Sequence, residues 1–161
     1  MFCVGDKVVY PTHGAGVIEA IEEKRILGKK KLYYIMRTMT GNMTLMIPTD
    51  NGEQTGIRSL ISRDEAKKVL EYFKNSPIEP DHSWNQRQRE NMSKIKSGDI
   101  YQVLDVLKEL MYRDRTKGLS TSERKLLNSA SQIALSELVM SGVADKSDVE
   151  CIMNDTIEGM L

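Results

Sequence analysis

The chain has 161 residues, of which 40% are hydrophobic and 29% charged, and this composition is typical of a soluble globular protein of one domain or two small ones. Lys and Arg together number 23, as do Asp and Glu, and a net charge of zero argues against a protein that coats nucleic acid non-specifically. No apolar run reaches the roughly 18 residues of a membrane span, and the N-terminus lacks the features of a signal peptide, so we expect a cytoplasmic protein.

Short strands separated by turns account for the first part of the chain. Strand-forming residues occur at 8–10, 17–21, 32–37 and 43–47, and turn residues fall at 14–16, 28, 40–42 and 48–52. We therefore expect a small β-barrel or sandwich whose strands are about five or six residues long.

From Ser62 onward the apolar period becomes helical, and capping boxes mark the helix starts. In such a box a Ser side chain and a Glu or Gln three residues later each satisfy a free amide. Asp99 can cap a further helix, and Gly118 and Gly142 stand where helices should end. We expect about five helices, the first a linker helix from Ser62 to Asn75. The four predicted boxes are Ser62/Glu65, Ser83/Gln86, Ser120/Glu123 and Ser147/Glu150.

The change of period predicts a two-domain α+β protein. Residues 1–60 form the β domain and residues 61–161 the helical domain, in which 62–82 are the linker helix and an extended, proline-containing connection. Residues 81–117 carry eight basic and six acidic side chains, whereas 118–161 carry three and seven. The middle of the chain is therefore the part that we expect to face an anion.

Trp84, the only tryptophan, opens a helix whose next seven residues contain no apolar side chain. A packing residue should have apolar partners three, four and seven positions later, but only Met92 and Ile95, farther along, can give this helix a buried face. An exposed ring beside Arg87 and Arg89 at a helix N-terminus suits a reader of the minor groove or of a fork junction.

Each of these features also has a purely structural interpretation. Trp84 could pack on the linker helix, near Tyr72 or Phe73. The basic residues of the next helix could form a solvated face that pairs with the interleaved acids; they are Lys108, Arg113, Arg115 and Lys117.

Two segments of the β domain are candidate partner-binding surfaces. The run from Met43 to Pro48 is unusually apolar for an alternating strand, so either a partner covers its outward side chains or the strand is central with both faces buried. The charged segment from Glu22 to Lys31 is either a solvated hairpin or a polar contact to a protein partner.

The sequence lacks the sets of residues that catalysis or metal binding requires. His13 and His82 are the only histidines and fall in different domains, and Cys3 and Cys151 lie at opposite ends of the chain. We expect no enzyme, no metal site, no cofactor and reduced thiols, with His13 as a structural residue beside a glycine turn.

Five separated motifs resemble the CarD/CdnL family of bacterial transcription factors. The first, Val4 to Ile18 (VGDKVVYPTHGAGVI), is also similar to a module of the transcription-repair coupling factor, so it alone implies only the β domain. The others are Met46-Ile-Pro48, Trp84 at the start of an Arg-bearing helix, Lys94 to Asp99 (KIKSGD) and Gly118 to Lys125 (GLSTSERK). The resemblance covers nearly the whole chain.

The resemblance implies a Tudor-like or SH3-like β-barrel that docks on the β subunit of RNA polymerase. The residues expected at this contact are Lys24, Arg25, Met46, Ile47 and Pro48. It further implies that the helical domain stabilises the open promoter complex, with Trp84 as a wedge in the minor groove at the upstream edge of the −10 element. The residues expected at the DNA are Trp84, Asn85, Gln86, Arg87, Arg89 and Lys94.

Two positions depart from well-known members of the family. Gln86 replaces a basic residue and Met46 replaces an Arg of some members, so we expect weak affinity for free DNA and a more apolar polymerase contact; recruitment by polymerase fits the zero net charge. The alternative function is an adaptor that binds polymerase and, through the helical domain, a second protein. We expect a monomer, with a domain-swapped dimer as the alternative.

Overall fold

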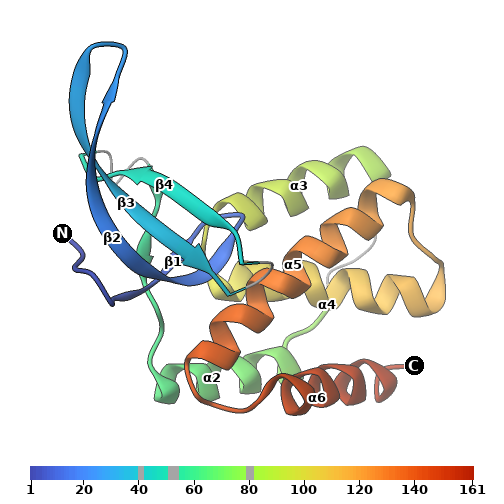
Figure 1. Ribbon diagram of the computed structural model, residues 1–161. Coiled ribbons are helices and arrows are strands. Elements are labelled where there is room, and N and C mark those ends of the chain that lie inside the picture. The colour runs from blue at the N-terminus through green and yellow to red at the C-terminus, as the bar shows by residue number, and fades with distance from the viewer. Residues whose placement is uncertain (40–41, 51–54, 79–81) are drawn as a thin grey trace.

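The computed structural model describes residues 1–39, 42–50, 55–78 and 82–161, and it contains an N-terminal β domain beside a C-terminal helical domain (Figure 1). The predicted turns at 40–42 and 48–52 and the predicted connection at 75–83 lie in part outside the described residues. The fold class predicted from the sequence is confirmed, because in the described residues an antiparallel sheet is followed by five helices.

The β domain is one antiparallel sheet with the strand order β4-β3-β2-β1-β5. Its strands are β1 (Lys7–Tyr10), β2 (Gly14–Ile26), β3 (Lys29–Thr38), β4 (Thr44–Pro48) and β5 (Arg58–Ser59). The sheet encloses a small apolar core formed by Val8, Ile18, Tyr34, Met36 and Ile47.

Two strands are longer than expected, because β2 has 13 residues and β3 has 10. They continue past β4 as a two-stranded hairpin that projects from the domain (Figure 1), and its charged side chains are exposed, as both the solvated and the partner-binding interpretation require. Leu27 and Gly28 join them with φ of 53° and 78°, the positive values of a type I′ turn. The twist of this turn matches that of the strands, so pairing continues through charged residues that the apolar pattern could not reveal.

The helices are α2 (Arg63–Asn75), α3 (Trp84–Lys96), α4 (Ile100–Thr116), α5 (Thr121–Met140) and α6 (Lys146–Glu158). Three of the four predicted boxes mark true helix starts, since Ser62, Ser83 and Ser120 each accept a hydrogen bond from the amide three residues later. Ser120/Glu123 is a complete capping box, whereas Glu65 accepts from Tyr101 and Gln86 donates to Glu90. Asp99 caps α4, as predicted. Gly118 and Gly142 have φ of 81° and 82°, which confirms left-handed conformations at these helix ends.

The fourth box, Ser147/Glu150, is wrong. Asp145 caps α6, and its carboxylate accepts a hydrogen bond from the Asp148 amide at 2.9 Å. Ser147 instead donates its hydroxyl to Asp145 at 3.1 Å. A carboxylate also interacts favourably with the positive end of the helix dipole, so it is the stronger of two nearby caps.

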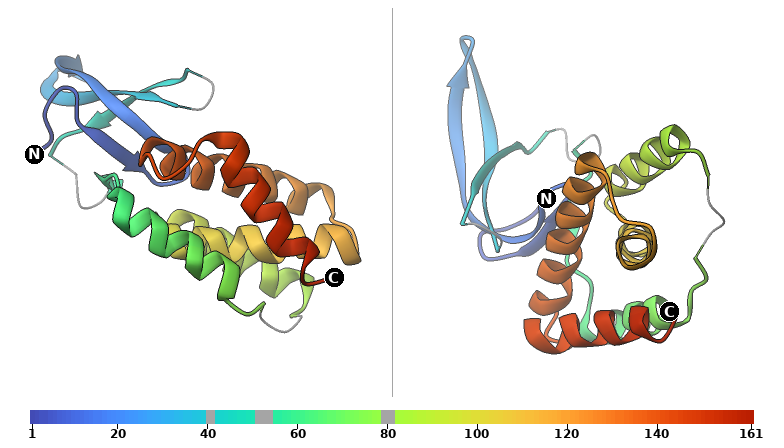
Figure 2. Two further views of the ribbon diagram at one scale, coloured as in Figure 1. Left: turned by 90° about the horizontal axis from the view of Figure 1, so that it is seen from below. Right: turned by 90° about the vertical axis from the view of Figure 1, so that its right-hand side faces the viewer.

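Helix α4 lies at the centre of the helical domain and contacts the other four helices (Figure 2, right). Its buried apolar residues are Ile100, Val103, Leu104, Val106, Leu107 and Leu110.

Within the described residues, no helix is long and apolar enough to cross a membrane.

Helix α5 packs against β2 and joins the two domains. The Ala15 amide donates to Ser136 Oγ at 3.0 Å. At Gly14, which has φ of 87°, a Cβ would lie only 2.6 Å from the same oxygen. The approach of β2 to α5 therefore requires glycine at this position.

Candidate functional site

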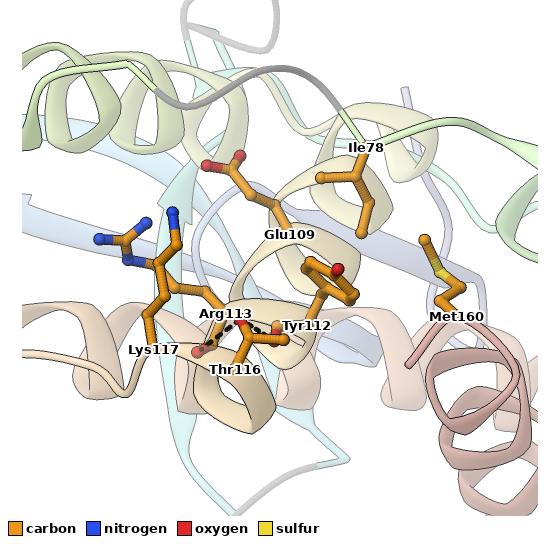
Figure 3. A pocket seen from close by; sticks show the side chains of 7 residues that line it. All are labelled: Ile78, Glu109, Tyr112, Arg113, Thr116, Lys117 and Met160. Atoms are coloured by element: carbon orange, nitrogen blue, oxygen red, sulfur yellow. Dashed lines mark hydrogen bonds between the residues drawn. The ribbon is translucent and has the colours of Figure 1, made fainter.

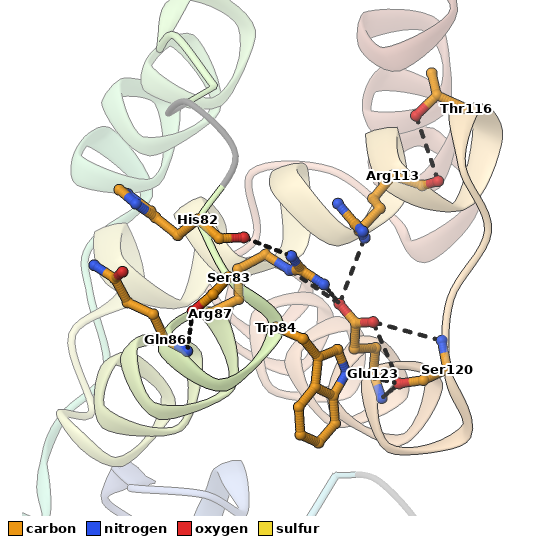
Figure 4. A network of polar contacts seen from close by, with 9 residues as sticks. All are labelled: His82, Ser83, Trp84, Gln86, Arg87, Arg113, Thr116, Ser120 and Glu123. Carbon is orange, nitrogen blue, oxygen red and sulfur yellow. Dashed lines mark hydrogen bonds and ion pairs between the residues drawn. The ribbon is translucent and has the colours of Figure 1, made fainter.

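Trp84 is the first residue of α3, and 46% of it is exposed. Its indole Nε1 donates to the Ser120 hydroxyl of α5 at 3.4 Å, and Figure 4 shows the ring pointing away from the polar network behind it. Packing on the linker helix α2 is therefore wrong as an interpretation. There, Tyr72 donates its hydroxyl to Asp105, and Phe73 is fully buried.

Arg87 lies on the inner face of α3 and is only 7% exposed. Its guanidinium donates to the Glu123 carboxylate, with 3.4 Å between Nε and Oε2, and to the His82 carbonyl at 2.8 Å. The expectation that Arg87 stands exposed beside Trp84 is wrong. Sequence periodicity could not show this, because the buried face of α3 consists of Arg87, Asn91 and Ile95 and is mainly polar.

Glu123 is the junction at which three helices meet. It is 3% exposed, and its Oε2 lies 3.4 Å from Arg87 Nε of α3 and 3.7 Å from Arg113 Nε of α4. Its Oε1 accepts from the amide and the hydroxyl of Ser120, which completes the capping box of α5 (Figure 4). A buried carboxylate with these partners is compensated, so it can hold the helices together without a large cost of burial.

The outer face of α3 carries the side chains that are free to meet a ligand. Arg89 and Asn85 are exposed, as expected. Met92 is also exposed, against the expectation that it is buried, and with Arg89 and Lys96 it lines an open hollow along the helix. Sequence reasoning did not select Met92 or Lys96 for the site, although their positions three and seven residues after Arg89 place them on the same side of the helix as Arg89.

Two other expected DNA contacts lie elsewhere on α3. Gln86 is half-buried and donates its side-chain amide to Glu90 at 3.0 Å. Lys94 lines a small hollow of about 110 Å³ together with Tyr72, Asp105 and Lys108. The structure therefore leaves Trp84, Asn85 and Arg89 exposed, whereas Lys94 lines a different hollow from the one that Arg89 lines.

Lys108 is buried. Both interpretations of this side chain, as part of an anion-facing surface or of a solvated helix face, required it to be exposed, so both are wrong for Lys108. Its ammonium donates to the Ser76 carbonyl at 2.6 Å and to the Phe73 carbonyl, so it satisfies the C-terminal end of α2. Burial lowers the pKa of Lys108, and Asp105 partly opposes this effect. Arg113 pairs with Glu123 of α5 and Arg115 with Glu158 of α6, so these two ion pairs join α4 to neighbouring helices and are not the predicted pairing with the interleaved acids of α4.

The outer face of β4 is the candidate polymerase-binding surface. In the described sheet β4 is an edge strand, so the alternative of a central strand is wrong. Met46 is 47% exposed, whereas Ile47 points into the core and has no surface for a partner. Pro48 is half-buried, and Lys24 and Arg25 are exposed on the hairpin, where Lys24 pairs with Glu22 at 3.0 Å.

A pocket of about 380 Å³ lies beside the C-terminal half of α4 (Figure 3). Its lining residues are Ile78, Glu109, Tyr112, Arg113, Thr116, Lys117 and Met160. Thr116 donates its hydroxyl to the Tyr112 carbonyl at 3.0 Å, and these seven residues include no histidine or cysteine. The described residues also contain no group of three potential metal ligands.

His13 stacks on Tyr10 in the β domain, with 5.2 Å between the ring centroids, consistent with its predicted structural role.

Models of two known protein families match this chain, one in each domain. Residues 2–61 match the CarD-like/TRCF RID domain, and residues 68–154 match the C-terminal domain of CarD. The fold and these matches define a transcription factor whose N-terminal domain is of a type that interacts with RNA polymerase. The chain belongs to the CarD-like family, which confirms the resemblance noted from its motifs.

Two known proteins illustrate this similarity. YdeB of Bacillus subtilis (strain 168), whose name describes a candidate transcription factor, is 40% identical over 147 residues, which are 91% of this chain and 96% of YdeB. A solution NMR structure of the 72-residue N-terminal domain of Myxococcus xanthus CarD has 32% sequence identity to this chain. It covers 37% of this chain and 79% of that domain, with a TM-score of 0.33.

Proposed function

We propose that this protein binds the β subunit of RNA polymerase through its β domain and stabilises the open promoter complex through Trp84. In this proposal, the ring enters the minor groove at the upstream edge of the −10 element and slows collapse of the bubble. The observation that carries the proposal is the 46% exposure of Trp84 at the first turn of α3, outside both apolar cores.

The surroundings of Trp84 suit contact with melted DNA. An apolar wedge gains by stacking on unpaired bases, while nearby cations hold the phosphate backbone. In this proposal Arg89 and Lys96 supply the cations farther along α3, where they line an open hollow together with Met92. Arg87 takes a different part in this proposal, because its burial against Glu123 fixes α3 and so positions Trp84.

Recruitment by polymerase explains how a chain of zero net charge can act on DNA. Once one domain is bound, the other meets its site at a high effective concentration and needs little affinity of its own. We propose that Met46, Pro48, Lys24 and Arg25 make the polymerase contact. We further propose that the polymerase-binding domain ends and the DNA-contacting domain begins near residue 60, and that the protein acts as a monomer.

The test is the lifetime of competitor-challenged open complexes on a promoter with a weak bubble, measured with cognate polymerase. We expect the wild-type protein to lengthen this lifetime and Trp84→Ala to remove the effect, while both bind the β subunit equally. Met46→Glu should weaken binding to the β subunit, whereas Met160→Glu, which alters an exposed methionine in the helical domain, should leave it unchanged.

The outcomes separate the wedge from an adaptor function. If the wild-type protein binds polymerase without changing the open-complex lifetime, the wedge is excluded. If Trp84→Ala instead loses a second protein partner, the helical domain serves as the adaptor surface.

A further inference from the structure

We propose that Ser120, the N-cap of α5, positions the ring of Trp84, so that the wedge is set in its working orientation before DNA is bound. This inference rests on the proposed function of Trp84 and adds a residue that lies 36 positions away in the chain. The contact is the hydrogen bond from the indole Nε1 to Ser120 Oγ at 3.4 Å.

A tryptophan at a helix start needs such a contact to hold one orientation. The exposed half of the ring has no protein neighbours to restrict its rotation, so its position depends on the few contacts of the other half. The indole has one donor, and Ser120 is the acceptor that the structure gives it.

Ser120 is itself held by bonds that do not involve Trp84. Its hydroxyl accepts from the Glu123 amide at 3.2 Å and lies 3.2 Å from Glu123 Oε1, to which it can donate. Glu123 is buried against Arg87, which belongs to the same helix as Trp84. Ser120, which accepts from the indole, and α3, which carries the ring, are therefore both bound to the Glu123 carboxylate (Figure 4).

The single tryptophan makes ring motion directly measurable, because the intrinsic indole fluorescence of the full chain comes from Trp84 alone. Ser120→Gly removes the acceptor while glycine remains an acceptable N-cap. Ser120→Thr keeps the hydroxyl, and Ser62→Gly makes the same change at the N-cap of α2. We expect time-resolved anisotropy to show a larger fast component in Ser120→Gly, with the other two variants like the wild type.

The functional arm uses the same variants in the open-complex assay. We expect Ser120→Gly to reduce the lifetime gained from the factor by about two- to tenfold, the range of one neutral hydrogen bond, with binding to the β subunit unchanged. In a Trp84→Phe background, which keeps a ring but lacks the donor, Ser120→Gly should have no further effect.

The two arms separate failure of this inference from failure of the proposed function. Unchanged anisotropy in Ser120→Gly, or an equal change in Ser62→Gly, overturns the positioning role. An unchanged or longer open-complex lifetime with Ser120→Gly, while Trp84→Ala still removes the effect, also overturns it. A wild-type protein that does not lengthen the lifetime overturns the wedge, whereas anisotropy of the free protein still decides whether Ser120 holds the ring.

Discussion

Arg58 of β5 and Glu137 of α5 form a two-bond ion pair between the two domains, with both N–O distances at 2.7 Å. Glu137 is 0% exposed and also accepts a hydrogen bond from the Ile61 amide at 3.2 Å. Arg58 Nε donates to the Gly98 carbonyl at 2.9 Å. Because planar bidentate pairing restricts orientation as well as distance, this pair fixes how the β domain sits on the helical domain.

Removing either partner of this pair should destabilise the protein, but unequally. Arg58→Ala leaves a buried carboxylate without its cation, and we expect a loss of about 3 to 5 kcal/mol in the free energy of unfolding. Glu137→Gln should cost less, about 1 to 3 kcal/mol, because Arg58 is 30% exposed and can still reach water. Urea denaturation measures both values.

A surface pair provides the control for this prediction. Arg37 and Glu19 are 2.6 Å apart but have side chains 59% and 34% exposed, so Arg37→Ala should change stability by no more than about 1 kcal/mol. Equal losses for Arg58→Ala and Arg37→Ala would show that the interdomain pair contributes no more than a surface contact.

Gly14→Ala should separate the domains or destabilise the protein more than the same change in a free turn. Gly14 has φ of 87°, and a Cβ there would lie 2.6 Å from Ser136 Oγ. Gly28→Ala is the matched control, because its φ of 78° imposes similar strain but nothing lies within 4 Å. We expect about 1 to 2 kcal/mol of strain at Gly28 and about 1 to 3 kcal/mol more at Gly14. Similar melting temperatures for the two variants would contradict the close approach of β2 to α5.

The cap of α6 should make part of the stability depend on acidic pH. Hydrogen bonds from the Asp148 amide and from Ser147 lower the pKa of Asp145 below its ordinary 3.8. A carboxyl whose pKa is lower in the folded state stabilises the protein above 3.8, and this contribution is lost as the pH falls through the folded value. The difference in stability between the wild type and Asp145→Ala should therefore become smaller as the pH falls below 3.8.

Thermal unfolding followed by circular dichroism at several pH values measures this gap. Asp145→Asn is the control, because asparagine caps as well but does not titrate, so its gap to Asp145→Ala should stay nearly constant. A larger loss from Ser147→Ala than from Asp145→Ala at neutral pH would restore Ser147 as the cap.

The sequence by itself determined the division into a β domain and five helices, because hydrophobic period, turn residues and N-caps are local properties. It also indicated an exposed Trp84, since a helix with no apolar residue three, four or seven positions later offers that ring no neighbour on its own face. The family motifs are likewise a property of the sequence.

Only the tertiary structure decided which charged side chains are buried. Arg87, Lys108 and Glu137 look like surface residues in the sequence, and a charge can be buried only where another element supplies its partner. Those partners are Glu123 for Arg87, the last carbonyls of α2 for Lys108, and Arg58 for Glu137. Each comes from more than 30 positions away, so no local pattern contains it, and the same distance separates Trp84 from the hydroxyl that holds its ring.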